Sequence, residues 1–437
     1  MSTLLLRGRL LSFLTEPESI EDRASYRYEE DGGLLIRDGK IAAMGDFHLV
    51  SREAGRDVPV VDHRPHLILP GFIDTHAHFP QMQVIASYGT ELLEWLNKYT
   101  FPEETRFADL QHGRRIARLF LDELIRQGTT TVVAYCSVHK ESADAFFAEA
   151  ESRDMLVVGG KVMMDRNAPD ALTDTPQTSY DDTKELIAHW HGRARGHYAI
   201  TPRFAITSSP EQMEMAGALA AEHPELHIQT HLSENHAEIA FTQELYPWSK
   251  DYTDIYEHYG LAGPKTLFGH SIHLSEREAD ALSDAGSVAV FCPTSNLFLG
   301  SGLFDYQRYR RRAKPLRVST ATDVGGGTNY SMLRTMDEGY KIIALNGEKL
   351  NPLASFWQIT LGNAKALSLE ETIGTLDIGT DADLVVLDVK ATPAMRLRME
   401  RIETLAEELF LMQTMGDDRC VREVYVAGKP VKSELAG

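Results

Sequence analysis

The sequence has little cysteine, no long apolar run and too few basic residues to balance its acids. Three cysteines, Cys136, Cys292 and Cys420, are too few for a disulfide framework and indicate a reducing compartment. No apolar run is long enough to span a membrane, and the N-terminus turns polar at Arg7, too early for a secretory signal, so we expect a cytoplasmic protein. With 44 basic against 64 acidic residues, the formal net charge of −20 argues against a nucleic-acid partner.

The two ends of the chain differ in pattern from its middle. Both ends consist of short apolar runs separated by turn signals such as Asp31-Gly32-Gly33 and Asp381-Ala382-Asp383. The middle alternates short β-branched runs with longer amphipathic stretches, which is typical of parallel strands joined by helices. We therefore predict one small β domain made from residues 1–68 and 372–437, and a central α/β domain at 69–371.

The middle of the chain contains eight such β-branched runs. Eight strand–helix units predict a closed (β/α)8 barrel of the TIM type, whose site lies at the carboxyl ends of the strands. An open doubly wound sheet is the alternative, but it needs a glycine-rich phosphate loop after the first strand, which Gly71-Phe72-Ile73-Asp74 does not supply. The runs lie near residues 67–73, 130–135, 156–163, 198–206, 226–230, 266–269, 288–292 and 317–322.

Side chains that bind metals or transfer protons follow four of these runs. The pair after the first run is spaced by two, so a strand would turn both imidazoles to one side. Each position also has a structural alternative: a packed histidine, a first-turn acid of a helix, or a turn residue before glycines. A barrel would bring all four strand ends together, which favours one shared site. The residues are His76 and His78 after the first run, His231 and Glu234 after the fifth, His270 after the sixth and Asp323 after the eighth.

The motifs around these residues resemble the amidohydrolase superfamily and, within it, the guanine deaminases. The resemblance covers nearly the whole chain. It implies a (β/α)8 barrel with a β-sandwich from both termini, a homodimer, and zinc-dependent hydrolytic deamination of guanine to xanthine and ammonia. The segments that carry it are Asp74–Gln81, Thr201–Ala205, Gln229–Asn235, Gly269-His270, Cys292–Asn296 and Thr322–Gly327.

The resemblance also implies a role for each matching residue. Zinc would be held by four ligands: His76, His78, His231 and Asp323. Catalysis would use Glu234 as the proton shuttle, His270 to orient water or the tetrahedral centre, and Asp323 to take a proton from water. The purine would be held by Gln81, Arg203 and Phe204, beside His231 and Asp323.

Elementary chemistry agrees with these roles. Three neutral imidazoles and a carboxylate leave zinc a position for water, whose pKa falls from about 15.7 toward about 7. The fork of Arg203 fits the O6 and N7 acceptors of guanine and disfavours adenine, Gln81 offers a donor and an acceptor, and Phe204 could stack on the ring. Without the resemblance, a salt bridge explains Arg203 equally well, and core packing explains Phe204.

Several alternatives stay open at this point. A two-metal centre needs a carboxylated lysine after the fourth strand, where the sequence has none, and Lys161 lies inside the third run. The same centre could act on 8-oxoguanine, cytosine, adenosine-type compounds or triazines, or the barrel could be a non-catalytic scaffold. Imidazole and carboxylate ligands do not separate zinc from iron. His273 is the alternative to His270, and Trp95 belongs to a lid, to the core or to a subunit contact.

Overall fold

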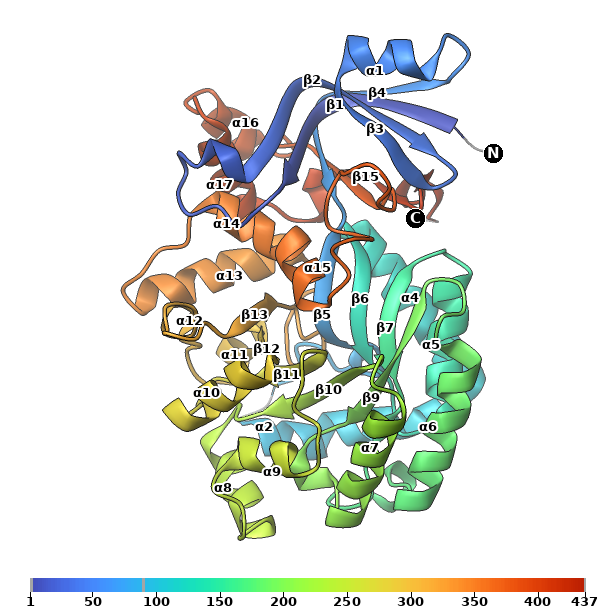
Figure 1. Cartoon of the computed structure of the whole chain (residues 1–437), viewed down its shortest axis with the longest axis vertical. Coiled ribbons are helices and arrows are strands. Elements are labelled where there is room, and N and C mark those ends of the chain that lie inside the picture. Colours follow the sequence, from blue (N-terminus) through green and yellow to red (C-terminus); the bar gives the residue numbers. More distant parts are fainter. Residues whose placement is uncertain (1–2, 89–90, 436–437) are drawn as a thin grey trace.

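The computed structural model describes residues 3–88 and 91–435 and contains the predicted barrel (Figure 1). Its strands pair in parallel in chain order, with the two-residue strand β8 (Val162–Met163) attached to the side of β9. The barrel strands are β5 (Phe72–His78), β6 (Thr129–Tyr135), β7 (Leu156–Gly160), β9 (Gly196–Pro202), β10 (His227–Leu232), β11 (Thr266–His270), β12 (Val288–Phe291) and β13 (Arg317–Thr320).

Side chains close the barrel between its first and last strands. The amide nitrogen of Asn363 donates to the carbonyl oxygens of Ile73 at 2.7 Å and Thr320 at 2.8 Å, and its oxygen accepts from the Thr320 N–H at 2.9 Å. Beyond the end of β13, the backbone N–H of Asp323 donates to the carbonyl oxygen of His76 at 2.9 Å, and the backbone N–H of His78 donates to that of Val324 at 3.0 Å. The carboxyl ends of β5 and β13 therefore lie side by side.

Amphipathic helices cover the outside of the barrel. In α4, Ile116, Phe120 and Leu124 recur at a spacing of four and are buried against the strands, as expected for a helix with one apolar face. The covering helices are α4 (Leu110–Arg126), α5 (Lys140–Glu151), α6 (Pro176–Trp190), α7 (Pro210–Glu222), α8 (His236–Leu245), α9 (Tyr252–His258), α10 (Glu276–Ala285), α11 (Pro293–Phe298), α12 (Tyr306–Arg310), α13 (Met332–Leu345), α14 (Pro352–Trp357) and α15 (Asn363–Ala366).

Short helical turns follow β5 and cross the carboxyl-terminal end of the barrel. They carry apolar side chains that are buried although they lie outside the barrel, among them Leu92, Trp95 and Phe101. These turns are η2 (Phe79–Gln81), α2 (Leu92–Trp95), the π-helical turn η3 (Leu96–Thr100), α3 (Phe101–Glu104) and η4 (Thr105–Ala108).

Both terminal segments form one seven-stranded mixed sheet, at the top of Figure 1, which confirms that the two ends of the chain build one β-rich unit. Helices α1 (Phe47–Ala54), α16 (Pro393–Met399) and α17 (Leu405–Met415) accompany it. In sheet order the strands are β16 (Lys429–Pro430), β15 (Val421–Val426), β14 (Leu384–Leu387), β4 (Val60–Pro70), β1 (Thr3–Phe13), β2 (Tyr26–Arg37) and β3 (Lys40–Asp46).

Gly71 alone separates β4 of the terminal sheet from β5 of the barrel. A Cβ at this position would lie 2.1 Å from the hydroxyl oxygen of Thr130, so the chain needs glycine there. The terminal sheet thus lies at the amino end of β5, opposite the end that carries His76 and His78. Among the helices of the described residues, none combines the length and the apolar character needed to cross a membrane.

Candidate active site

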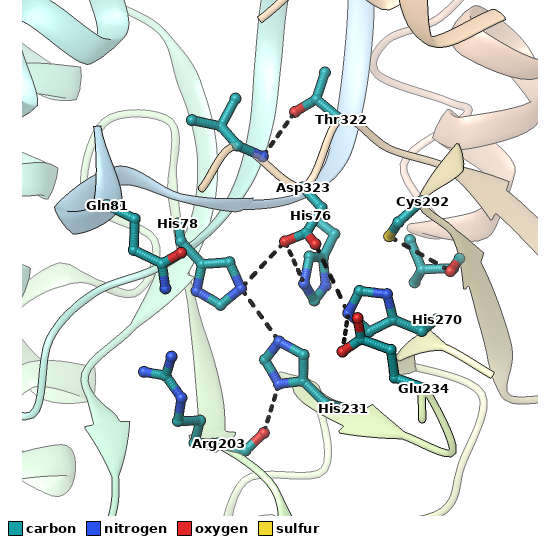
Figure 2. Close-up of polar contacts among 12 residues, drawn as sticks. His76, His78, Gln81, Arg203, His231, Glu234, His270, Cys292, Thr322 and Asp323 are labelled. Atoms are coloured by element: carbon teal, nitrogen blue, oxygen red, sulfur yellow. Dashed lines mark hydrogen bonds and ion pairs between the residues drawn. The ribbon is translucent and has the colours of Figure 1, made fainter. Parts of the chain in front are cut away.

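Five predicted residues meet at the carboxyl ends of the barrel strands (Figure 2). The Nε2 atoms of His78 and His231 lie 3.2 Å apart. One carboxylate oxygen of Asp323 lies 3.4 Å from Nε2 of His76 and 3.4 Å from Nε2 of His78. The second oxygen of Asp323 lies 3.8 Å from Nε2 of His270. Strands that are far apart in the chain therefore place these groups around one point.

Hydrogen bonding fixes the tautomer of His231. Its Nδ1 lies 2.7 Å from the carbonyl oxygen of Arg203, which can only accept, so Nδ1 carries the proton. In neutral imidazole the lone pair is then on Nε2, the atom that faces His78. The buried Nε2 of His76 has no hydrogen-bond partner within the described part of the chain. The Nε2 atoms of His231 and His76 are therefore suited to bind a cation. A metal-ligating histidine commonly donates its other N–H to a carbonyl group, as His231 does.

The protonation states match a cation site. Burial lowers the pKa of His76, and it lowers the pKa of His78 and of His231 well below the ordinary value. Burial alone would raise the pKa of Asp323, but the adjacent imidazoles of His76 and His270 hold that pKa at about 2. The donor set is three neutral imidazoles and one carboxylate, which suits a divalent ion such as zinc.

His270 differs from the other three histidines. Its Nδ1 lies 3.1 Å from the side-chain oxygen of Asn296, and its Nε2 lies 3.3 Å from Glu234. Burial lowers the pKa of His270, but the carboxylates of Glu234 and Asp323 outweigh burial and raise it above the ordinary value. Both ring nitrogens of His270 face acceptor oxygens, which favours a ring with an N–H on Nε2 rather than a lone pair. One ring nitrogen of His270 still lies within 4.8 Å of the possible ligand atoms of His76 and Asp323. These three residues therefore also form a group that could hold a metal ion.

Glu234 lies just before helix α8 rather than in its first turn. The hydroxyl of Ser301 donates to one of its carboxylate oxygens at 2.8 Å. Burial raises the pKa of Glu234, against the opposing charge of His270. The helix cap is formed by Asn235 and Glu238, so a capping role does not account for Glu234. A buried carboxyl group with a raised pKa, beside an imidazole, is suited to carrying protons.

Backbone strain gathers at the same strand ends. Ser233, His270, Ser271 and Asp323 all have positive φ angles, of 50°, 67°, 51° and 50°. Residues other than glycine rarely adopt this conformation, and it costs free energy that the surrounding structure must offset. All four positions hold or adjoin the chemically active groups, so the strain serves to aim them.

A pocket opens beside the cluster. Gln81 and Arg203 form its polar side, and Phe204 and Trp95 belong to an apolar wall continued by Leu92, Leu96 and Leu299. The side chain of Trp95 thus lines the pocket from the segment that crosses the barrel end. Arg203 lines the pocket. It also forms a salt bridge with Glu104 at 2.7 Å, which was the structural alternative to a ligand-binding role.

The two alternative residues make structural contacts outside the cluster, and three residues near the site were not predicted from the sequence. Nε2 of His273 lies 2.7 Å from the carbonyl oxygen of Ser301, outside the cluster, and Lys161 forms a buried ion pair with Asp174. The sequence reasoning missed Glu104, Asn296 and Glu238. The Asn296 motif was noted without a role, and the only sequence signal for Glu238 was its place in the first turn of α8.

A parallel barrel with histidines and a carboxylate at its strand ends defines a class, the barrel enzymes with a candidate metal centre. Within this class, the chain belongs to the amidohydrolase family, whose sequence profile matches residues 67–431. It is 45% identical to guanine deaminase of Escherichia coli (strain K12), over 98% of this chain and 97% of that protein.

Two solved structures extend the comparison. The structure of E. coli guanine deaminase superimposes with a TM-score of 0.95 at 45% identity and covers 98% of this chain and 99% of its own. The guanine deaminase from C. acetobutylicum, solved with guanine bound in its active site, has a TM-score of 0.86 at 31% identity. It covers 98% of this chain and 100% of its own.

Proposed function

We propose that the chain catalyses the hydrolytic deamination of guanine to xanthine and ammonia. The observation that carries this proposal is one pocket that unites Arg203 and Gln81 with Glu234 and the histidine cluster. The guanine deaminases that resemble the chain over nearly its full length support the same substrate. Residues 69–371 would hold the whole site, and 1–68 with 372–437 would form the terminal domain. The cytoplasmic location and the homodimer stay predictions.

The proposed metal ligands are His76, His78, His231 and Asp323. Their lone pairs and single negative charge fit one divalent ion, and we favour zinc over iron. When bound, zinc supplies Lewis acidity that makes water a nucleophile near neutral pH. Arg203 and the backbone around it hold His231 in the ligating tautomer, because its Nδ1–H donates to the Arg203 carbonyl oxygen.

Three side chains would carry the protons and the developing charge. In the overall reaction, water adds to C2 of guanine and the exocyclic amine leaves as ammonia. Asp323 and Glu234 together accept the two protons that the water loses, and Glu234 delivers one proton to ring N3 and one to the leaving amine, which is otherwise a poor leaving group. His270, fixed through Nδ1 by Asn296, donates from Nε2 to the oxygen that adds to C2.

The other half of the pocket would recognise the purine. Arg203 presents its free N–H groups to acceptors on the ring edge, and Gln81 contacts the neighbouring edge. Phe204 is 4% exposed and belongs to the apolar wall, where it contacts the ring face. His231 and Asp323 border the reacting end of the same space.

The test is ammonia release from guanine by the wild type and by Glu234→Gln, with metal content measured on both. We expect about one zinc per chain in each protein and a rate loss of roughly 10² or more in Glu234→Gln. The matched control is Glu244→Gln, at an exposed position of α8, which should keep the wild-type rate. Turnover of 8-oxoguanine, cytosine or adenine without turnover of guanine would contradict the proposal.

A further inference from the structure

Glu104 joins the two polar residues of the pocket. One of its carboxylate oxygens accepts from the side-chain amide of Gln81 at 2.8 Å, and the other accepts from Arg203 at 2.7 Å. The side chains of Arg203 and Glu104 are 3% and 1% exposed, and Gln81 is equally buried. Gln81 and Arg203 lie on the same side of the histidine cluster (Figure 2). A buried carboxylate thus holds both groups at once.

A carboxylate paired with arginine can only accept hydrogen bonds, and this decides which way the Gln81 amide points. The NH₂ group of Gln81 must face Glu104, so its oxygen is the end left for a ligand. That oxygen lies against Gly325, where a Cβ would come within 2.0 Å of it. Gln81 and Arg203 both line the pocket, so the acceptor that Gln81 offers there lies next to the donors of Arg203.

We infer that Glu104 is a positioning residue that sets the specificity of the pocket for 6-oxopurines. This inference rests on the proposed function. A 6-oxopurine has an N1–H donor beside the O6 acceptor, which complements the acceptor of Gln81 and the donors of Arg203. A 6-aminopurine has the reverse pattern, an acceptor at N1 and a donor at C6, and leaves buried groups unpaired. A site built on such pairing rejects the wrong pattern strongly.

The substitution Glu104→Gln should reverse the polarity of Gln81. Arginine only donates, so the new amide would turn its oxygen to Arg203 and its NH₂ to Gln81. Gln81 would then turn its own oxygen toward residue 104 and offer its NH₂ to the ligand. The change keeps the size of the side chain, and it converts a fixed acceptor in the pocket into a donor.

Calorimetric binding of hypoxanthine and adenine to the zinc-loaded protein tests this inference. Hypoxanthine has the 6-oxo pattern and no amine to lose, so it is a stable probe. We expect the wild type to prefer hypoxanthine by at least about 100-fold. In Glu104→Gln that preference should fall by at least about 10-fold. The matched control, Glu103→Gln, alters the preceding residue, which pairs with Arg106, and should keep the wild-type preference.

Equal weakening of both ligands in Glu104→Gln, or an unchanged preference, would overturn the inference. If Glu104→Gln does not fold, wild-type binding of 1-methylhypoxanthine replaces it, since a methyl group at N1 removes the donor that Gln81 accepts. The inference then expects at least about 10-fold weaker binding than that of hypoxanthine, and equal binding refutes it. A wild type that shows the preference but releases no ammonia from guanine would refute the proposed function alone.

Discussion

The imidazole of His231 is oriented by the backbone of Arg203, whose carbonyl oxygen lies 2.7 Å from Nδ1 of the ring. The side chain of the same arginine lines the pocket and pairs with Glu104. One residue therefore reaches the metal centre through its backbone and the ligand pocket through its side chain. The two contributions are separable by mutation, because a substitution at Arg203 leaves the carbonyl oxygen in place.

Arg203→Lys should bind as much metal as the wild type and turn over guanine with a kcat/KM lower by at least about 10-fold. Lysine keeps the charge beside Glu104 but lacks the forked donors. Metal analysis and steady-state kinetics check the two parts of this prediction. Arg193→Lys, at an exposed ion pair with Glu151, is the control with wild-type values for both. Loss of metal from Arg203→Lys would mean that the side chain, and not the backbone, holds His231.

The metal site gives a prediction on stability. Removal of the ion with a chelator should abolish ammonia release and lower Tm, because an ion present at about 100 times its Kd stabilises the folded state by roughly 2.7 kcal/mol. Added zinc should restore both. His78→Ala should purify with little metal and show no further fall in Tm on chelation. His273→Ala, which alters a histidine outside the cluster, should behave as the wild type. Full activity of the chelated wild type would contradict the proposed metal requirement.

The barrel was predictable because each strand–helix unit carries its own pattern. Buried β-branched runs and amphipathic helices are local signals, and eight of them in series limit the topology to a closed barrel or an open sheet. The positions of His76, His78, His231, His270 and Asp323 followed from the same reasoning, since the ends of parallel strands converge.

The partners of these residues were not predictable from the sequence. Glu104 lies 99 residues from Arg203, on a short turn that crosses the barrel end, and no periodicity links them. Arg203 was interpreted as either a salt-bridge residue or a ligand-binding residue, and in the structure it both forms the ion pair and lines the pocket. The bond between His270 and Asn296 likewise depends on how two loops pack.

Glu238 should affect catalysis through the position of Glu234. Its carboxylate accepts the backbone N–H groups of Glu234 at 2.8 Å and Asn235 at 3.0 Å. Glu238→Gln keeps an acceptor oxygen and should keep most of the activity. Glu238→Ala leaves buried N–H groups unpaired and should cost about 1–3 kcal/mol of stability, with a larger change in kcat than in KM.

The control for Glu238→Ala is Glu407→Ala in the exposed cap of α17. There, Glu407 accepts from the backbone of Glu403 at 3.1 Å and of Thr404 at 3.2 Å, in a cap of the same kind far from the site. It should lower stability by about 1 kcal/mol or less and leave kcat unchanged. Equal kcat values for Glu238→Ala and the wild type would refute a positioning role for Glu238.

Acid should destabilise the fold in part through His227, at the amino end of β10. Its Nε2–H donates to the carbonyl oxygen of Leu367 at 2.9 Å, and burial lowers the pKa of His227 to about 4 from the ordinary 6.5. Between these values the unfolded chain binds more protons than the folded one, so stability is full above about pH 6.5 and falls as the pH drops toward about 4. The loss from this residue is at most roughly 3 kcal/mol.

His227→Gln keeps a donor for Leu367 and does not titrate. The free energy of unfolding, measured in urea at pH 7 and pH 5, should therefore fall less with acid in His227→Gln than in the wild type, by about 2 kcal/mol. His48→Gln, at an exposed position of α1, should follow the wild type. An identical acid dependence in His227→Gln and the wild type would show that His227 does not resist protonation in the folded state.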